Sequence, residues 1–169
     1  QRYILKPHLI GKRKYDIRVF ALAVGHVETG LLRGYYYEEG YLRTSCKDYT
    51  TKNLDNKFVH LTNDAIQKQD ENFGKFENFN KMSYGDFQRY LNTYHEELNI
   101  NVEHHIIPQI KKLITDTIRA TCFKLDSKRL LNSFEILGYD FMLDENFKLS
   151  LIEVNTNPCL ETESPLLSR

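Results

Sequence analysis

The sequence ILGYDFMLDENFKLSLIEVNTNP (residues 136–158) decides the fold of this chain. Two apolar runs flank the polar, turn-like residues 144–148, and this pattern favours a β-hairpin. Side chains alternate between the two faces of a strand, so Glu153 and Asn155 point to the same side of the second run. We therefore expect a hairpin whose second strand ends in a carboxylate and an amide.

The first run of this hairpin carries one acidic residue, Asp140, among apolar neighbours. A carboxylate buried without a partner is costly, so Asp140 is expected to pair with a cation or a metal ion. A register that places residue 140 opposite 151 or 153 puts Asp140 on the face of Glu153 and Asn155. A one-residue shift puts it on the other face, and the sequence leaves both open. The alternative interpretation is a half-buried hairpin with one capping aspartate.

Composition places the chain among ordinary globular proteins. It has 169 residues, 41% hydrophobic and 27% charged, about the size of one domain. No apolar run is long enough for a membrane span, and no Lys/Arg tract is dense enough for nucleic acid. Neither a membrane nor nucleic acid is an expected partner. Cys46, Cys122 and Cys159 are widely spaced and odd in number, which indicates a reducing, intracellular setting rather than a disulfide framework or a zinc site.

The rest of the chain predicts strands first and helices second. Alternating apolar residues bounded by turn signals predict strands at 1–5, 14–24, 30–37 and 41–46. Residues 47–82 show little periodicity and are expected to be loop around one ordered island, 58–63. Helices are expected from Ser83, with Asp86 as a capping partner, and over residues 102–123. This order predicts an α+β (α/β) fold, a mostly antiparallel sheet with helices packed on one side.

Strong polar residues recur at strand positions in this chain, in a pattern typical of phosphoryl transfer, where cations and a metal–carboxylate cluster stabilise charge. There is no GxxxxGK[ST] or GxGxxG motif, so a P-loop or Rossmann site is not expected. Five motifs in order, over roughly residues 1–165, resemble those of the tubulin tyrosine ligase-like family. They are Lys14-Tyr15-Asp16-Ile17-Arg18, Glu39-Gly40-Tyr41-Leu42-Arg43, His60-Leu61-Thr62-Asn63 with Gln67-Lys68, Gly138-Tyr139-Asp140-Phe141, and Glu153-Val154-Asn155-Thr156-Asn157-Pro158.

The resemblance implies an ATP-grasp fold, of which residues 1–169 would be the C-terminal portion, with the N-terminal and central parts absent. It implies an ATP-dependent ligase that activates a protein carboxylate as an acyl phosphate and joins it to the amine of a free amino acid. The implied protein substrate is tubulin or a related protein, met on microtubules through acidic C-terminal tails. The implied amino acid is glutamate, glycine or tyrosine. The implied location is the cytoplasm and microtubule cytoskeleton, including the cilium or basal body.

The same resemblance assigns expected roles to individual residues. ATP would be bound by Gln1, Arg2, Tyr3, Ile4, Lys14, Asp16, Thr62 and Asn63. The catalytic cations would be Arg18, near the phosphates, and Arg43, on the amino acid or the reacting carboxylate. Mg²⁺ would be held by Asp140, Glu153 and Asn155, whose oxygen atoms suit a hard cation rather than zinc. His60 is expected to be a core histidine bonded to backbone.

One departure from the family pattern bears on specificity. Asp64-Ala65 stands where many glutamate- and glycine-adding members have Tyr-Ser, and Ala65 has no hydroxyl to hold the added amino acid. Two other functions stay open: a small-molecule carboxylate–amine ligase, such as a D-alanine–D-alanine ligase, and a pseudoenzyme that binds microtubules without ligating. The His60–Asn63 motif weighs against the first, and the intact acidic set against the second.

Overall fold

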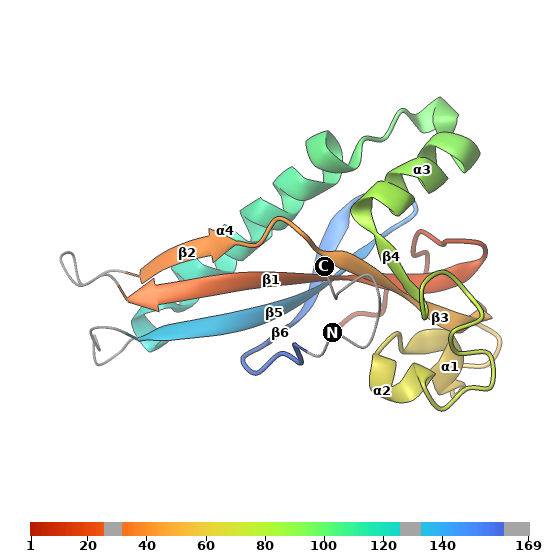
Figure 1. Ribbon diagram of the computed structural model, residues 1–169, viewed down its shortest axis with the longest axis horizontal. Helices are drawn as coiled ribbons and strands as arrows, with labels where there is room; N and C mark the ends of the chain where they lie inside the picture. Colours follow the sequence, from red (N-terminus) through yellow and green to blue (C-terminus); the bar gives the residue numbers. More distant parts are fainter. Residues whose placement is uncertain (26–31, 126–132, 161–169) are drawn as a thin grey trace.

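The computed structural model describes residues 1–25, 32–125 and 133–160. Within them six strands form one antiparallel sheet in the order β4-β3-β1-β5-β6, with β2 paired to the far half of β1 (Figure 1). The strands are β1 (Arg13–Gly25), β2 (Leu32–Tyr36), β3 (Tyr41–Asp48), β4 (Lys81–Ser83), β5 (Phe134–Leu143) and β6 (Leu149–Asn155). The expected α+β fold with an antiparallel sheet is confirmed.

Two long helices cover one face of this sheet, as Figure 1 shows. They are α3 (Tyr84–Tyr94) and α4 (Ile107–Leu125), joined through a 3₁₀ turn η1 (Glu96–Leu98) and a π-helical turn η2 (Val102–Ile106). Two one-turn helices, α1 (Lys57–His60) and α2 (Asp64–Gln67), lie below the β3 end of the sheet in the same view. The long helices build the core, and the short ones border the opposite, open face.

The core lies between the helices and one face of β1. Ile17, Val19 and Ala21 alternate along that strand and are at most 2% exposed. They meet the buried stripe of η2 and α4, whose members are Ile106, Ile110, Ile114 and Ile118. Strand alternation therefore turns the intervening side chains of β1, among them Asp16 and Arg18, toward the open face.

Helix α3 begins where the sequence predicts. Ser83 is its N-cap, and its hydroxyl oxygen accepts the backbone N–H of Asp86 at 3.0 Å. The same hydroxyl donates to the Asp86 carboxylate at 2.6 Å. The N-cap side chain thereby satisfies one of the otherwise unpaired donors of the first turn.

Two expectations about the first half of the chain are wrong. Residues 1–5 form no strand; side chains hold them instead, as when the Gln1 amide donates to the Ile152 carbonyl at 2.7 Å. Residues 47–82 contain α1, α2 and β4 rather than only loop around an island. These elements are three or four residues long, too short for a period to show in the sequence. In the expected strand 30–37, residues 30 and 31 lie outside the described part.

The hairpin places the three candidate metal ligands on one face. Asp140 pairs with Glu153, and Gly138 pairs with Asn155, between β5 and β6. Nearer the turn the register is shifted by one residue, with Phe141 opposite Leu151. A β-bulge therefore separates the two registers, and it turns Glu153 to the face of Asp140. The register that brings these residues together is confirmed.

Candidate functional site

The open face of the sheet carries a buried network of two arginines and two aspartates. Arg18 donates to Asp140 through Nε at 2.5 Å and Nη2 at 3.1 Å. Arg43 donates to Asp16 through Nε and Nη2, both at 2.7 Å, and its Nη2 lies 2.9 Å from Asp140 Oδ2. All four side chains are at most 8% exposed. Neighbouring strands thus supply opposite charges in pairs that neutralise one another.

Electrostatics favour the ionised state of this network. Burial by itself would raise the pKa of Asp140, but the Arg18 and Arg43 guanidinium groups outweigh it and hold that pKa below its usual value. Burial would likewise lower the pKa of Arg43, and the Asp16 and Asp140 carboxylates instead raise it. The ion pairs with Arg18 and Arg43 confirm the expectation that Asp140 pairs with a cation.

A first pocket of about 340 Å³ opens beside this network. It is lined by the N-terminal segment, β1, the α1–α2 connection and the hairpin. The lining residues are Gln1, Arg2, Tyr3, Ile4, Lys14, Asp16, His60, Leu61, Thr62, Asn63, Asp140, Met142, Ile152 and Glu153. Apolar residues such as Ile4, Leu61 and Met142 line it together with charged ones, which suits a ligand with an apolar part and a charged part.

Lys14 is the buried cation of the first pocket. Its Nζ donates to the His60 carbonyl at 2.8 Å and to the Tyr3 hydroxyl at 3.3 Å. Burial lowers the pKa of Lys14 to about 8, and the charge of Asp16 opposes that shift. Two of the three ammonium donors are thus directed to neutral partners, a carbonyl and a hydroxyl.

His60 holds the wall of the first pocket in place. Its Nε2 donates to the Asn53 carbonyl at 2.9 Å, so its Nδ1 is the acceptor for the Tyr3 hydroxyl at 2.7 Å. The expectation of a core histidine bonded to backbone is confirmed. On the same wall the Thr62 hydroxyl donates to Asp16 at 2.5 Å and ties the α1–α2 connection to β1.

A second pocket of about 330 Å³ adjoins the first and shares Asn63 and Glu153 with it. Its lining residues are Arg18, Tyr41, Arg43, Asn63, Asp64, Ala65, Lys68, Lys81, Glu153, Asn155, Asn157, Pro158 and Cys159. Lys81 Nζ lies 2.7 Å from Asp64 Oδ2, and the lysine side chain is 5% exposed. This pocket is rich in cations, and three of them lie near a carboxylate of the protein: Arg18 near Asp140, Arg43 near Asp16 and Lys81 near Asp64.

The structure brings together the residues singled out in the sequence, because each of the thirteen lines one or both pockets. Sequence reasoning noted Asp64 but missed Lys81, its partner. Lys81 lies on β4 opposite Arg43, in a segment interpreted as loop. A lysine three residues before a helix does not by itself indicate a functional position. The pairing of β3 with β4 is what places Lys81 beside Arg43.

The three candidate metal ligands fit a magnesium ion. The described residues hold no group of three or more His, Cys, Asp or Glu side chains suited to a metal, so the set consists of two carboxylates and one amide. Asp140 accepts three hydrogen bonds from arginines, which leaves one of about four acceptor positions on its carboxylate. Glu153 is exposed and accepts from Asn155 Nδ2 at 3.2 Å. Oxygen donors of this kind suit Mg²⁺.

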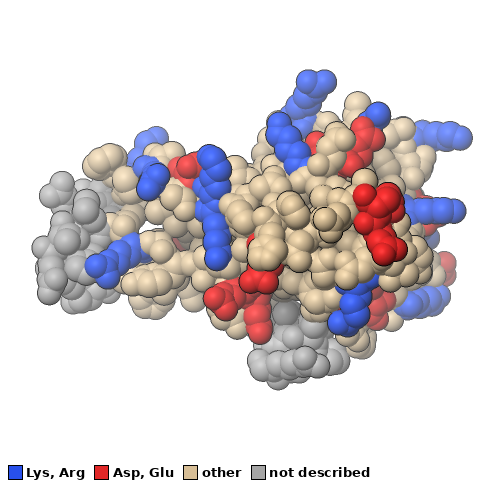
Figure 2. Space-filling model, turned by 90° about the horizontal axis from the view of Figure 1, so that it is seen from above, with Lys and Arg blue, Asp and Glu red and all other residues tan. Residues whose placement is uncertain are grey.

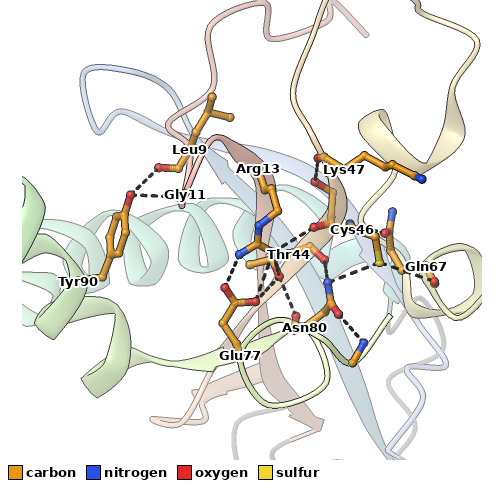
Figure 3. Close-up of polar contacts among 12 residues, drawn as sticks. Leu9, Gly11, Arg13, Thr44, Cys46, Lys47, Gln67, Glu77, Asn80 and Tyr90 are labelled. Carbon is orange, nitrogen blue, oxygen red and sulfur yellow. Dashed lines mark hydrogen bonds and ion pairs between the residues drawn. The ribbon is translucent and has the colours of Figure 1, made fainter. Parts of the chain in front are cut away.

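A second polar network connects β3 to Arg13, Gln67, Glu77 and Asn80 (Figure 3). Arg13 forms an ion pair with Glu77 and donates to Thr44 at 3.0 Å. Asn80 donates to the Thr44 carbonyl at 3.1 Å, and Gln67 accepts the backbone N–H of Cys46 at 2.7 Å. These contacts fasten the segment between α2 and β4 to β3, and so fix the backbone that carries Arg43.

The surface on the helix side shows no such concentration of charge. In Figure 2 the Lys and Arg side chains are scattered among Asp, Glu and a broad uncharged area. None of the helices described is both long enough and apolar enough to cross a membrane.

A sheet face with paired charges and two adjoining pockets is suited to an enzyme that handles phosphate and carboxylate groups. The chain belongs to the tubulin-tyrosine ligase family, whose family model matches residues 1–169.

Several relatives agree with this membership. The chain is 38% identical over 170 residues to tubulin glycylase 3D of Tetrahymena thermophila, and 34% identical to glycylase 3C of the same organism. It is 30% identical over 164 residues to the probable tubulin polyglutamylase TTLL9 of Rattus norvegicus. These alignments include 97–100% of the chain. The chain spans 16% of the length of the two glycylases and 34% of that of the polyglutamylase.

Proposed function

We propose that this chain is the C-terminal portion of an ATP-grasp ligase that joins an amino acid to a carboxylate of tubulin, using ATP and Mg²⁺. The observation that carries the proposal is the convergence of all thirteen candidate residues on two adjoining pockets. The names of the related glycylases and polyglutamylase support tubulin as the protein substrate. The proposed location is the cytoplasmic microtubule cytoskeleton, including cilia.

The reaction has two steps. A carboxylate oxygen of tubulin attacks the γ-phosphorus of ATP, which gives an acyl phosphate and ADP. The amine of the free amino acid then attacks the acyl carbon, an amide bond forms, and phosphate leaves. Both steps develop negative charge on oxygen, which fixed cations stabilise best in a site that excludes water.

The first pocket is assigned to the nucleotide. Gln1, Arg2, Tyr3 and Ile4 would border the adenine, and Lys14 would reach the phosphates. Asp16, Thr62 and Asn63 would position the ribose and the phosphates through the α1–α2 connection. Asp140, Glu153 and Asn155 would hold Mg²⁺, which neutralises charge on the phosphates.

The second pocket is assigned to the reacting carboxylate and the amino acid. Arg18 lines this pocket, and Glu153 lines both pockets. Arg43 uses Nε and Nη2 for Asp16, which leaves Nη1 to contact a substrate carboxylate. Part of the Arg43 guanidinium group is therefore already bonded to the protein, and only the remaining N–H groups could bind a substrate carboxylate.

Membership of the tubulin-tyrosine ligase family weighs against a small-molecule carboxylate–amine ligase. A microtubule-binding pseudoenzyme is the remaining competitor. The test uses the full-length protein with ATP, Mg²⁺, tubulin and, in separate reactions, glycine, glutamate or tyrosine. We expect ATP-dependent addition of one amino acid, read by mass spectrometry of the tubulin tails. Tubulin binding without any addition would favour the pseudoenzyme.

A further inference from the structure

The steps above do not use the Asp64–Lys81 ion pair, whose two residues line the second pocket. Lys81 is 5% exposed and Asp64 is 30% exposed, so the lysine lies in the wall and the carboxylate faces the cavity. A lysine buried to this degree is rare unless it is paired. The pair therefore adds no net charge to the pocket, and the Lys81 ammonium already has a carboxylate partner before any amino acid enters.

Size does not distinguish amino acids in this pocket. Its volume of about 330 Å³ falls within the range of small-molecule sites, roughly 300–1,000 Å³. Ala65 adds a small side chain to the wall beside Asp64. A glutamate side chain would find room, so discrimination against it has to come from charge.

Beside Lys81, the Asp64 carboxylate acts against an acidic side chain. A second carboxylate near Lys81 would have to displace Asp64, or lie beside it unpaired. Like charges placed together at a desolvated interface cost several kcal/mol, about 10²-fold or more in affinity. Glycine brings no side chain to this wall and meets no such cost.

We propose that Asp64, by occupying Lys81, is the specificity-determining residue that restricts the second pocket to amino acids without an acidic side chain, glycine above all. This inference rests on the proposed ligase function and names the substrate class of the same site. Asp64 acts through Lys81 and by repulsion; it takes no part in either bond-forming step.

Asp64→Asn in the full-length enzyme tests the inference, because it removes the charge and keeps the shape. The readout is kcat/KM for glutamate divided by kcat/KM for glycine, with tubulin as acceptor. We expect this ratio to rise at least about 10-fold, mainly through a lower KM for glutamate. Asp116→Asn is the matched control, because it neutralises an aspartate paired with Lys112 on the exposed face of α4; the ratio should stay unchanged.

A second variant shows where the new carboxylate binds. Lys81→Met added to Asp64→Asn should abolish the gained use of glutamate and leave use of glycine, because the cation that receives the side-chain carboxylate is gone. Thermal melting of each variant separates this effect from loss of fold.

The outcomes separate the inference from the function on which it rests. Ligation of glycine by the unaltered enzyme, with no change of ratio in Asp64→Asn, would overturn the inference and keep the function. The inference would also be overturned if the unaltered enzyme used glutamate as efficiently as glycine. It would be overturned too if the double variant kept the gained use of glutamate. Absence of ligation with every amino acid would contradict the proposed function itself.

Discussion

Glu153 and Asp140 have opposite environments although they are paired across the hairpin. Asp140 is 3% exposed and bonded to two arginines, whereas Glu153 is exposed at the rim shared by both pockets. Asp140 therefore contributes to the stability of the buried ion-pair network, in addition to its proposed role as a metal ligand. Glu153 is exposed and outside this network, so a substitution there tests function with less effect on the stability of the fold.

Glu153→Gln in the full-length enzyme should abolish ligation and leave the fold intact. The substitution removes one charge from the proposed magnesium site and keeps the oxygen that accepts from Asn155. A loss of about 10²–10³-fold in rate or more is expected, as for other preorganised electrostatic groups. Steady-state turnover and thermal melting measure the two effects. Normal turnover with a normal Mg²⁺ requirement would contradict the assignment.

Arg43→Lys should cost both activity and stability. Lysine keeps the charge but has no planar fork, so the paired bonds from Nε and Nη2 to Asp16 are lost. A hydrogen bond to a charged group contributes about 1.5–3 kcal/mol, so the loss of two should lower the free energy of unfolding by at least about that much. Lys12→Ala, a change at an exposed residue, is the control. Equal, small effects of both changes in denaturation and turnover would show that Arg43 has no special role.

Lys14 makes ATP binding sensitive to pH. Its pKa in the free protein is about 8, lowered from 10.5 by burial, and a nearby phosphate would raise it again. Binding should therefore take up a proton near pH 8–9, and ATP affinity should fall as pH rises above 8. Lys14→Arg, which stays charged, should remove this dependence. Calorimetry in buffers of different ionisation enthalpy measures the proton uptake, and equal heats in all of them would contradict the assignment.

The same shift has a consequence for stability. The unfolded chain holds the Lys14 proton up to about pH 10.5 and the folded chain only to about pH 8. Between these values the unfolded state binds more protons, so the contribution of Lys14 to folding stability rises with pH in this window.

At the scale of elements, the sequence predicts the long strands and helices and fails at the short ones. The alternation over β1 and the Ser83 cap of α3 are visible because they extend over several residues or have a defined chemical partner. Helices α1 and α2 and strand β4 are three or four residues long. They are held by tertiary contacts, such as Gln67 with Cys46, which no local pattern reveals.

The candidate site was predictable by motif but not by geometry. The hairpin turn and its two strands follow from apolar runs around polar residues, yet the β-bulge after Asp140 has no sequence signal and decides which face Glu153 occupies. The pairing of Arg18 and Arg43 with buried aspartates also depends on strand order. The position of Lys81 in the site became visible only from the pairing of β4 with β3, which places Lys81 opposite Arg43.

Gly138→Ala should disturb the β5–β6 hairpin. A Cβ at this position would lie 2.7 Å from Pro158 Cβ and 3.4 Å from Arg18 Nη1, so the segment after β6 must move. Overpacking of this kind costs about 1–3 kcal/mol, and the shift should lower turnover because residues 157–159 line the second pocket. Gly85→Ala is the control, since its Cβ meets its neighbours at 3.8 Å. Equal melting temperatures and turnover for both variants would contradict the close packing of Pro158.

At the scale of the whole molecule, the arrangement is one-sided. The core and the long helices occupy one face of the sheet (Figure 1). Residues of the other face, among them Asp16, Arg18 and Arg43, line the two pockets. Arg18 and Arg43 are neutralised by Asp16 and Asp140, so this face offers a triphosphate less net positive charge than its arginines suggest. Mg²⁺ and further cations would have to supply the rest.

Residues 1–169 produced alone should therefore bind ATP weakly and not ligate. By resemblance, ATP-grasp enzymes enclose the nucleotide between two domains, and this chain spans 16% of its glycylase relatives. Without a cover, Tyr3 at 40% exposure and its apolar neighbours gain little by contacting an adenine that stays in water. Calorimetry with Mg-ATP should give a dissociation constant near 1 mM or weaker, about −4 kcal/mol, against tighter binding by the full-length protein. Micromolar binding together with ligase activity would show that the described face suffices by itself.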